Sequence, residues 1–330
     1  MSATTGKLRW GILGVAKINE RLLPAFAKAR NAEVRAIASR SRDKAQAAAR
    51  AAGIPVAHGS YEALLDDPTI DAVYNPLPNT LHDEWTRKAA ERGKHILCEK
   101  PLCPTAAEAQ KLVSFCRVMR VRLMEGFMWP HHPRTAKLRQ FLRSGAIGPI
   151  VRVGSAFTFP LPLEPNNIRL KPEMAGGSLL DVGCYPVFGI RWAFSAEPIR
   201  AYATAVDQFG VDVSMSGLLW FADGGVGAFD CGFTMPLRMG VEIVGTEGVV
   251  RVPDMWLPAP RASFLVEREG QPTEEICIEN EDQIVHMIED FGRAVLEQRE
   301  PVPSPDEAVK TLRVLDALGM SARTGQAVTV

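Results

Sequence analysis

The first 125 residues alternate short apolar runs with stretches in which apolar residues recur at helical spacing. The apolar runs predict strands at residues 8–13, 33–38, 72–74, 95–97 and 122–124. The stretches between them predict helices at residues 18–28, 42–52, 82–92 and 106–120. Regular alternation of strand and helix is typical of parallel βαβ units. The pattern therefore predicts an α/β Rossmann-type domain with a doubly wound parallel sheet of five or six strands.

Local helix signals support this division of the chain. Thr105 is followed three residues later by Glu108, the spacing of a capping box, which predicts a helix start at this point. A further helix over residues 134–143 reads as a connector, because Ser144-Gly145 and then Pro149 follow it.

Beyond Pro149 the pattern changes to apolar positions that alternate with period two. Such runs predict mostly antiparallel strands at residues 151–157, 213–220, 226–229, 240–244 and 248–252. Helices are predicted at residues 178–194 and 283–297, and a last helix follows Ser304-Pro305-Asp306-Glu307. We therefore expect a Rossmann domain at residues 1–125 and an α+β domain for substrate binding and oligomerisation at residues 126–330. The last helix could pack back on the first domain.

The composition limits the classes of partner that the protein can be expected to bind. The 330 residues have a formal net charge of zero and no long basic block, which argues against nucleic acid or an anionic membrane as a partner and favours a small-molecule substrate. No apolar run reaches the roughly 18 residues that a membrane span needs, and the opening segment is short and polar, so we expect a cytoplasmic protein. The six cysteines lie scattered among apolar neighbours, and we expect them to be reduced and buried.

The end of the first predicted strand carries a candidate phosphate-binding turn. Its residues are Gly14, Val15, Ala16, Lys17 and Ile18. The stretch Gly14-x-Ala16-x-x-Asn19 keeps only the first of the three glycines of a dinucleotide fingerprint. A buried strand that merely ends in a glycine turn is the alternative, but the position in the first βα unit favours pyrophosphate binding on backbone N–H groups.

The end of the second strand bears on the choice of cofactor. Enzymes that select NAD usually place an acid here, whereas a 2′-phosphate needs donors and positive charge. Ser39 and Arg40 stand at this point, and no acid follows Ala38 until Asp43. A solvated basic turn is the alternative, but it leaves the missing acid unexplained, so the sequence favours NADP.

Two further segments carry candidate chemistry. The strand over residues 95–97 runs into Glu99-Lys100-Pro101, which delivers Lys100 to the carboxyl edge of the sheet, where ligands bind. In the second half, Asp181 and Tyr185 are four residues apart and share one face of a predicted helix. Taken singly, a strand-end lysine is usually a surface residue and a helix tyrosine is usually a packing residue.

Together the motifs resemble the Gfo/Idh/MocA oxidoreductase family along nearly the whole chain. The resemblance rests on GILGVAKI, NPLPNTLH, CEKPL, MEGFMWPHHP, NNIR and GGSLLDVGCYP. It implies a nucleotide-binding domain followed by an open-faced antiparallel sheet, through which a homodimer or homotetramer commonly forms. It also implies that Lys100 is catalytic or orients the substrate, that Asp181 is the helix acid and that Tyr185 transfers the proton. Implied contacts to NADP, besides the turn at residues 14–18, Ser39 and Arg40, involve Asn75, Leu77, Pro78, Asn79, His82, Glu99 and Lys100.

Many members of the family have histidine where this chain has Tyr185. The tyrosine form resembles the branch that contains glucose-fructose oxidoreductase, dihydrodiol dehydrogenase, NADP-linked xylose dehydrogenase and sugar ketoreductases. Ala16 and Asn19 replace glycines of the family's loop, although relatives of this branch also accept alanine there. The implied activity is hydride transfer between nicotinamide and a sugar-like alcohol or carbonyl.

The expected mechanism requires a group that takes up the proton of the substrate hydroxyl, and Tyr185 is the candidate. A phenol titrates near about 10, and a nearby cation such as the Lys100 ammonium favours its ionised form. The same cation can polarise a carbonyl in the reverse direction, and Asp181 would orient the substrate or keep Lys100 charged. The candidate substrate-pocket residues are Trp129, His132, Asn167 and Arg169. The pair His131-His132 lacks suitably spaced acids or cysteines, so no metal is expected.

Two alternatives stay open. One is an enzyme that never releases its NADP and couples the oxidation of one sugar to the reduction of another. The other is a cofactor-binding sensor that has lost the chemistry, against which the presence of Lys100, Asp181 and Tyr185 argues.

Overall fold

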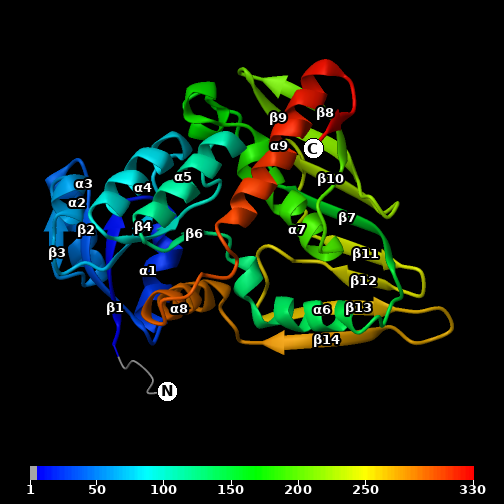
Figure 1. The fold of residues 1–330 in the computed structure, drawn as a ribbon, viewed down its shortest axis with the longest axis horizontal. Coiled ribbons are helices and arrows are strands. Elements are labelled where there is room, and N and C mark those ends of the chain that lie inside the picture. The colour runs from blue at the N-terminus through cyan, green and yellow to red at the C-terminus, as the bar shows by residue number, and fades with distance from the viewer. Residues whose placement is uncertain (1–5) are drawn as a thin grey trace. The chain divides into compact units, whose positions relative to one another are not determined.

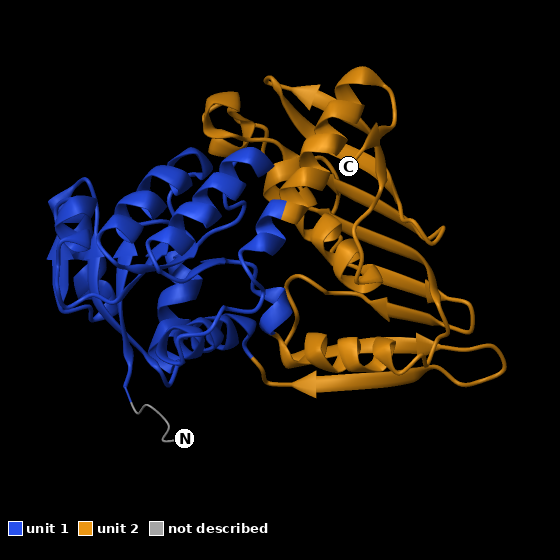
Figure 2. Ribbon diagram, in the orientation of Figure 1, with its two compact units in different colours: residues 1–131, 282–309 blue, residues 132–281, 310–330 orange. Residues whose placement is uncertain are grey.

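The computed structural model describes residues 6–330, and the contacts divide the chain into two compact units (Figure 2). The first unit comprises Met1–His131 and Asp282–Val309, and the second comprises His132–Glu281 and Lys310–Val330. This division differs from a single boundary after residue 125, because the segment at residues 282–309 returns to the first unit.

A parallel sheet forms the centre of the first unit. Its strands are β1 (Leu8–Leu13), β2 (Ala32–Ala38), β3 (Val56–His58), β4 (Ala72–Asn75), β5 (His95–Cys98) and β6 (Leu123–Glu125). Their order is β3-β2-β1-β4-β5-β6, and every neighbouring pair is parallel. The predicted doubly wound sheet is confirmed. The order reverses between β1 and β4, which is the point where nucleotides bind in such sheets.

The helices of the first unit are α1 (Asn19–Lys28), α2 (Arg42–Ala52), α3 (Tyr61–Leu65), α4 (His82–Glu91), α5 (Ala106–Val118) and α8 (Gln283–Leu296), labelled in Figure 1. Thr105 caps α5 as predicted, since its hydroxyl accepts from the Glu108 N–H at 3.3 Å. The Glu108 carboxylate returns to the Thr105 hydroxyl at 3.0 Å rather than to the backbone N–H.

Helix α8 belongs to the core of the first unit, although nearly the whole second unit precedes it in the chain. Its residues Ile284, Met287, Ile288 and Phe291 are buried in one cluster with Trp10 and Phe26. The Trp10 ring lies 5.0 Å from the Phe26 ring and 5.4 Å from the Phe291 ring, measured between centroids. The last helix, α9 (Asp306–Thr324), contributes only its first turn to this unit.

The second unit is built on a nine-stranded sheet. Its strands are β7 (Ile150–Thr158), β8 (Arg200–Gln208), β9 (Val211–Trp220), β10 (Val226–Gly232), β11 (Val241–Gly245), β12 (Val249–Val252), β13 (Arg261–Glu267), β14 (Glu274–Glu279) and β15 (Val328–Thr329). Their order is β14-β13-β12-β11-β7-β10-β9-β8-β15. All pairs are antiparallel except β7 and β10, which run parallel, so the predicted mostly antiparallel sheet is confirmed.

Three helices cover one face of this sheet: α6 (Pro133–Arg143), α7 (Cys184–Phe194) and α9. The Arg191 guanidinium of α7 donates to the Thr311 hydroxyl of α9 at 2.7 Å, and the Ser321 hydroxyl of α9 accepts from the Ala203 N–H of β8 at 3.0 Å. The nine-stranded sheet also carries a hollow of about 830 Å³. Its lining includes Arg152 of β7, Tyr202 of β8 and Leu218 of β9.

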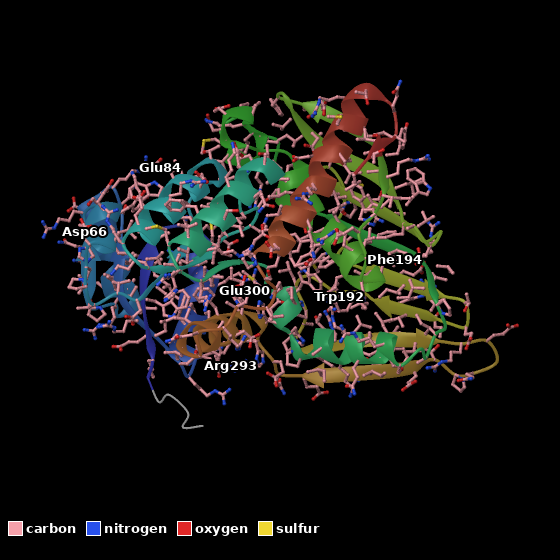
Figure 3. All side chains as sticks on the ribbon, in the orientation of Figure 1. Asp66, Glu84, Trp192, Phe194, Arg293 and Glu300 are labelled. Atoms are coloured by element: carbon pink, nitrogen blue, oxygen red, sulfur yellow. The ribbon has the colours of Figure 1, made fainter. Side chains whose placement is uncertain are left out.

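The surface of the first unit carries several ion pairs. Asp66 and Glu84, labelled in Figure 3, accept from Arg92 and Lys88 at 2.6 Å each. Exposed pairs of this kind contribute about 0–1 kcal/mol each, so the buried core rather than these pairs stabilises the unit. No helix within residues 6–330 is long and apolar enough to cross a membrane.

Candidate functional site

The β1–α1 turn has the geometry of an anion cradle. Gly14 has a φ of +99°, which favours glycine, and a Cβ at this position would lie 3.1 Å from the Leu77 side chain, so little room is left there. Along the described chain, no acceptor faces the backbone N–H groups of residues 15–18. The Asn19 side chain closes the turn by donating to the Gly14 carbonyl at 2.9 Å. The turn therefore fits a pyrophosphate even though it lacks two of the three glycines.

At the end of β2, Ser39 and Arg40 lie next to this turn, since the Gly14 N–H donates to the Ala38 carbonyl at 2.9 Å. The Ser39 hydroxyl accepts from the Ser41 N–H at 3.2 Å, while the exposed Arg40 forms no ion pair with any residue from 6 to 330. A free guanidinium beside a hydroxyl is suited to a phosphate monoester.

The segment that follows β4 contains the predicted residues Asn75, Leu77, Pro78, Asn79 and His82. Asn75 is fully buried, and its side chain forms hydrogen bonds within the protein. The amide nitrogen donates to the His82 carbonyl at 3.4 Å and to the Thr86 hydroxyl at 3.3 Å. The amide oxygen accepts from the Leu77 N–H. His82 is fully buried as well. Asn75 and His82 therefore shape the loop, and Pro78 and Asn79 lie in the partly exposed segment between them.

Lys100 stands in a turn that side chains hold on both sides. The residue before it, Glu99, accepts from the Tyr74 hydroxyl at 2.7 Å. The two residues after it are held by His82, 2.8 Å from the Pro101 carbonyl, and by Glu125, which accepts from the Leu102 N–H at 2.7 Å. The Lys100–Pro101 peptide is cis. The chain thus fixes the backbone on either side of Lys100 at the carboxyl end of β5.

The charge of Lys100 affects the pKa of Glu99 and the pKa of His82. Burial raises the pKa of Glu99, and the Tyr74 hydroxyl and the Lys100 ammonium oppose that rise. Burial also lowers the pKa of His82, and the Lys100 charge lowers it further. Lys100 is only partly buried, so its ammonium combines a rigid attachment with access to ligands.

The η2 turn (Trp129–His131) and the residue after it are buried. Trp129 is fully buried, and His132 caps α6 by accepting from the Arg134 N–H at 3.0 Å. The His131 ring lies 2.6 Å from the Asp290 carboxylate of α8. The two adjacent histidines thus contact different partners, Asp290 and the start of α6. No group of three or more potential metal ligands lies together in residues 6–330.

In the second unit, Asp181 lies in a π-helical turn, η5 (Leu179–Gly183), and Tyr185 in the first turn of α7. The continuous α-helix predicted over residues 178–194 is therefore wrong at its start. Asp181 and Tyr185 are both partly exposed, whereas the three residues between them, Val182, Gly183 and Cys184, are buried. This burial pattern agrees with the expectation that the two side chains share a face. The Tyr185 ring is packed edge-on against Phe157, with ring centroids 5.0 Å apart. Short π-helical segments are frequent at functional sites.

Asp181 is paired with a predicted substrate residue. The Arg169 Nε donates to the Asp181 carboxylate at 2.7 Å, and Asn167 accepts from the Arg169 N–H at 3.1 Å. The structure thus brings Asn167, Arg169 and Asp181 together within the second unit. Arg169 stays partly exposed, which leaves its remaining donors accessible.

Sequence reasoning missed several supporting residues. Asp212 anchors the start of the π-helical turn, since it accepts from the Ser178 hydroxyl at 2.6 Å and the Leu179 N–H at 2.7 Å. Burial raises the pKa of Asp212. Tyr74 and Glu125 support the Lys100 turn from two different strands. Glu125 directly follows the strand predicted at residues 122–124, so the sequence placed it at the carboxyl end of that strand. Nothing near Asp212 or Tyr74 in the sequence points to the residues they contact.

Comparison with known proteins identifies the fold. Residues 8–127 match the family model described as "Oxidoreductase family, NAD-binding Rossmann fold", and residues 135–251 match the "GFO/IDH/MocA C-terminal domain". The chain is 39% identical to D-xylose 1-dehydrogenase (NADP(+)) 2 of Haloferax volcanii, over 97% of this chain and 99% of the relative. It is 34% identical to dTDP-3,4-didehydro-2,6-dideoxy-alpha-D-glucose 3-reductase of Saccharopolyspora spinosa, over 96% and 98% of the two chains.

Solved structures agree with this. A 3-ketoreductase from Actinomadura kijaniata in complex with NADP and TDP-benzene has a TM-score of 0.89 at 30% identity, covering 96% of this chain and 98% of that one. An aldose-aldose oxidoreductase from Caulobacter crescentus complexed with glycerol has a TM-score of 0.92 at 25% identity, covering 98% and 100%. This chain therefore belongs to the Gfo/Idh/MocA family of oxidoreductases.

Proposed function

We propose that this protein is an NADP-dependent oxidoreductase that transfers hydride between the nicotinamide ring and a CH–OH or carbonyl group of a sugar or sugar-like substrate. The observation that carries the proposal is the turn around Lys100, in which Glu99, Pro101 and Leu102 are each held by a different side chain. Such fixation is expected of a residue that acts on a reacting atom. Relatives that act on xylose and on deoxysugar nucleotides support the substrate class.

The cofactor site follows from the first unit. The N–H groups of residues 15–18 would bind the pyrophosphate, and Arg40 with Ser39 would bind the 2′-phosphate. When bound, NADP supplies the hydride acceptor or donor. The absence of an acid between Ala38 and Asp43 supports NADP over NAD, since a carboxylate would repel the 2′-phosphate. Leu77 packs over Gly14 and gives this site an apolar wall.

Proton transfer is assigned to Tyr185. In the oxidative direction its phenolate accepts the hydroxyl proton of the substrate, and in the reverse direction its phenol returns it. The Lys100 ammonium would favour the phenolate and would polarise a carbonyl oxygen during reduction. The packing of the Tyr185 ring against Phe157 supports this role, because a fixed ring keeps its hydroxyl in one direction.

Asp181 and Arg169 are proposed to orient the substrate. Their mutual hydrogen bond at 2.7 Å holds both side chains, and the partly exposed guanidinium can still donate to sugar hydroxyls. Asn167 holds the backbone of Arg169 and completes this group. Trp129 and His132 are buried, so we assign them to the support of the pocket wall.

The test is an assay of the purified protein against a panel of aldoses, keto sugars and diols with NADP, NADPH, NAD and NADH. We expect NADPH absorbance to change with at least one sugar, and Tyr185→Phe to abolish the change. Tyr202→Phe removes the same hydroxyl group from strand β8 and should keep the activity. Because Tyr202 lines the hollow of the nine-stranded sheet, the sedimentation coefficient of this variant is compared with that of the wild type to detect any change of assembly. Full activity of Tyr185→Phe, or no turnover with any member of the panel, would overturn the proposal.

A second candidate is favoured by the likeness to the aldose-aldose oxidoreductase. In this version one sugar is oxidised and another reduced while NADP stays bound to the protein. NADPH or NADP that remains with the protein through gel filtration, together with turnover of a sugar pair without added cofactor, would support it. A protein that elutes free of nucleotide and needs added NADP would favour the simple dehydrogenase.

We further propose that a second copy of the chain binds over the hollow in the nine-stranded sheet and forms a homodimer or homotetramer. Leu218, 36% exposed, lies in this hollow with small residues such as Gly154 and Ala156, and charged residues including Arg152 and Glu242 also line it. Exposed apolar area of this kind favours contact with another chain. Leu218→Asp should shift the sedimentation coefficient toward that of the monomer. Val118→Asp, at the more exposed last residue of α5, should leave it unchanged. A wild-type monomer at all concentrations would contradict the proposal.

A further inference from the structure

His82, the first residue of α4, bridges two loops of the nucleotide-binding unit. Its Nδ1 lies 2.8 Å from the Pro101 carbonyl oxygen and its Nε2 lies 2.6 Å from the Leu77 carbonyl oxygen. The residue is 0% exposed. Its ring therefore spans the distance between the loop after β4 and the turn after β5, with both ring nitrogens directed at backbone carbonyls.

The chemistry of this arrangement makes the ring a tie between the loops. A neutral imidazole donates to one of the two carbonyls and a doubly protonated one donates to both. In either state the ring fills the space between them and supplies a buried carbonyl with a donor, without which that carbonyl would remain unsatisfied. An apolar side chain of similar size would fill the space but would donate to neither carbonyl.

The carbonyl that His82 holds belongs to the residue directly after Lys100. Glu99 and Leu102 are held independently by Tyr74 and Glu125, and His82 is a third side chain that holds the turn. The Lys100 charge opposes the rise in the pKa of Glu99 and contributes to the lowered pKa of His82. Displacement of the Pro101 carbonyl would thus be transmitted to Lys100 through a single peptide.

We propose that His82 is a positioning residue for Lys100: by tying the Pro101 carbonyl to the Leu77 carbonyl, it sets the direction from which the Lys100 ammonium meets the substrate oxygen. This inference rests on the proposed function for the role of Lys100. His82 itself is buried and acts only through the backbone, so it is distinct from a residue that contacts NADP.

The experiment compares His82→Gln and His82→Leu with the wild-type protein, and uses His95→Gln as the matched control. His95 is the first residue of β5, at the opposite end of the strand from Lys100, and its Nδ1 accepts from the Arg122 N–H at 2.9 Å. Each substitution thus removes one histidine that contacts the backbone of the same unit. Thermal unfolding of each variant reports the loss of stability separately from activity.

For His82→Leu we expect kcat to fall by about 100-fold, the effect of a misplacement of about 1 Å at a reacting group. The KM for the sugar should change far less, and His82→Gln, which keeps an N–H donor, should recover part of the loss. His95→Gln should retain the wild-type kcat. Equal losses of kcat in the His82 and His95 variants, or a wild-type kcat in both His82 variants, would overturn the proposal. If His82→Leu does not fold, His82→Gln against His95→Gln decides in the same way.

A second readout does not depend on turnover. Lysines of the NADPH-bound protein are reductively methylated with 13C, and Lys100→Ala identifies the Lys100 signal. We expect the Lys100 signal to move in His82→Gln and to stay in place in His95→Gln; an unmoved signal in His82→Gln would overturn the proposal. If no sugar is turned over, the proposed function fails, while this measurement still tests whether His82 positions Lys100.

Discussion

The Tyr74 hydroxyl, at the third position of β4, donates to the Glu99 carboxylate directly after β5 at 2.7 Å. This bond joins the ends of two neighbouring strands next to the turn that carries Lys100. It also opposes the burial that raises the pKa of Glu99. The carboxyl group next to Lys100 thus receives this hydrogen bond from the neighbouring strand β4.

Tyr74→Phe should therefore destabilise the protein and raise the pKa of Glu99 further. Loss of a donor to a buried polar group costs about 1–3 kcal/mol, which urea unfolding can measure. Tyr61→Phe is the control, because Tyr61 is also buried but its hydroxyl donates to no residue in the described range 6–330. Equal stability of the two variants would mean that the bond between Tyr74 and Glu99 contributes nothing.

Arg40→Asp should weaken NADPH binding by about tenfold to a hundredfold, because charge-assisted hydrogen bonds contribute about 1.5–3 kcal/mol. NADH binding should weaken much less, since NADH lacks the 2′-phosphate. Arg50→Asp makes the same change of charge in the last turn of α2 and should leave both affinities near the wild-type values. Fluorescence titration measures them, and an unchanged NADPH affinity in Arg40→Asp would contradict the cofactor assignment.

Much of this site could be predicted because its signals are local. Gly14 ends an apolar strand and Lys100 follows another, so the alternation of strands and helices alone predicts that both reach the carboxyl edge of one sheet. The partners of Lys100 could not be predicted in the same way. Tyr74 lies 25 residues from Glu99, and Glu125 lies 23 residues from Leu102, so only the order of the strands brings them to this turn.

The fold was harder to predict where periodicity is weak. Strand β14 has glutamates at both ends around Ile276-Cys277-Ile278, and β3 has only three residues, so neither shows a clear alternation. Helix α8 was predicted from its pattern, but its packing on α1 was not, because an amphipathic stripe shows that a partner exists without showing which one. The π-helical turn at Asp181 has no sequence signature that distinguishes it from an α-helix.

Thiol chemistry should be confined to one cysteine. Five of the six are buried, and burial raises the pKa of Cys116 to about 12 and that of Cys98 and Cys231 well above the usual value. The thiolate is the reactive form, so these side chains should resist alkylation. Iodoacetamide should modify Cys277, which is partly exposed, and mass spectrometry should find one adduct on the native protein and six after denaturation. Cys277→Ser should then show no adduct in the native state.

The contact between α8 and the β2 side of the first unit should depend on pH. Glu289 of α8 accepts from the Arg30 backbone N–H at 2.9 Å and from its Nε at 3.0 Å, and the hydrogen bond to Arg30 lowers the pKa of Glu289 despite the opposing effect of burial. A lowered pKa in the folded state means that the stabilising contribution is present above the pKa of 4.5 in the unfolded chain and is lost as the pH falls through the folded value. Glu289→Gln should therefore be less stable than the wild type at neutral pH.

The difference in unfolding free energy between wild type and Glu289→Gln should shrink as the pH falls below this range, because protonation of Glu289 makes the two side chains alike in charge. Glu33→Gln provides the control: Glu33 bonds to Arg35 at 2.9 Å on the exposed surface of β2, where an ion pair contributes little. Urea unfolding at a series of pH values measures both differences. If the difference in unfolding free energy between wild type and Glu289→Gln stays constant from neutral to acid pH, the charge of the Glu289 carboxylate does not stabilise the packing of α8 in the first unit.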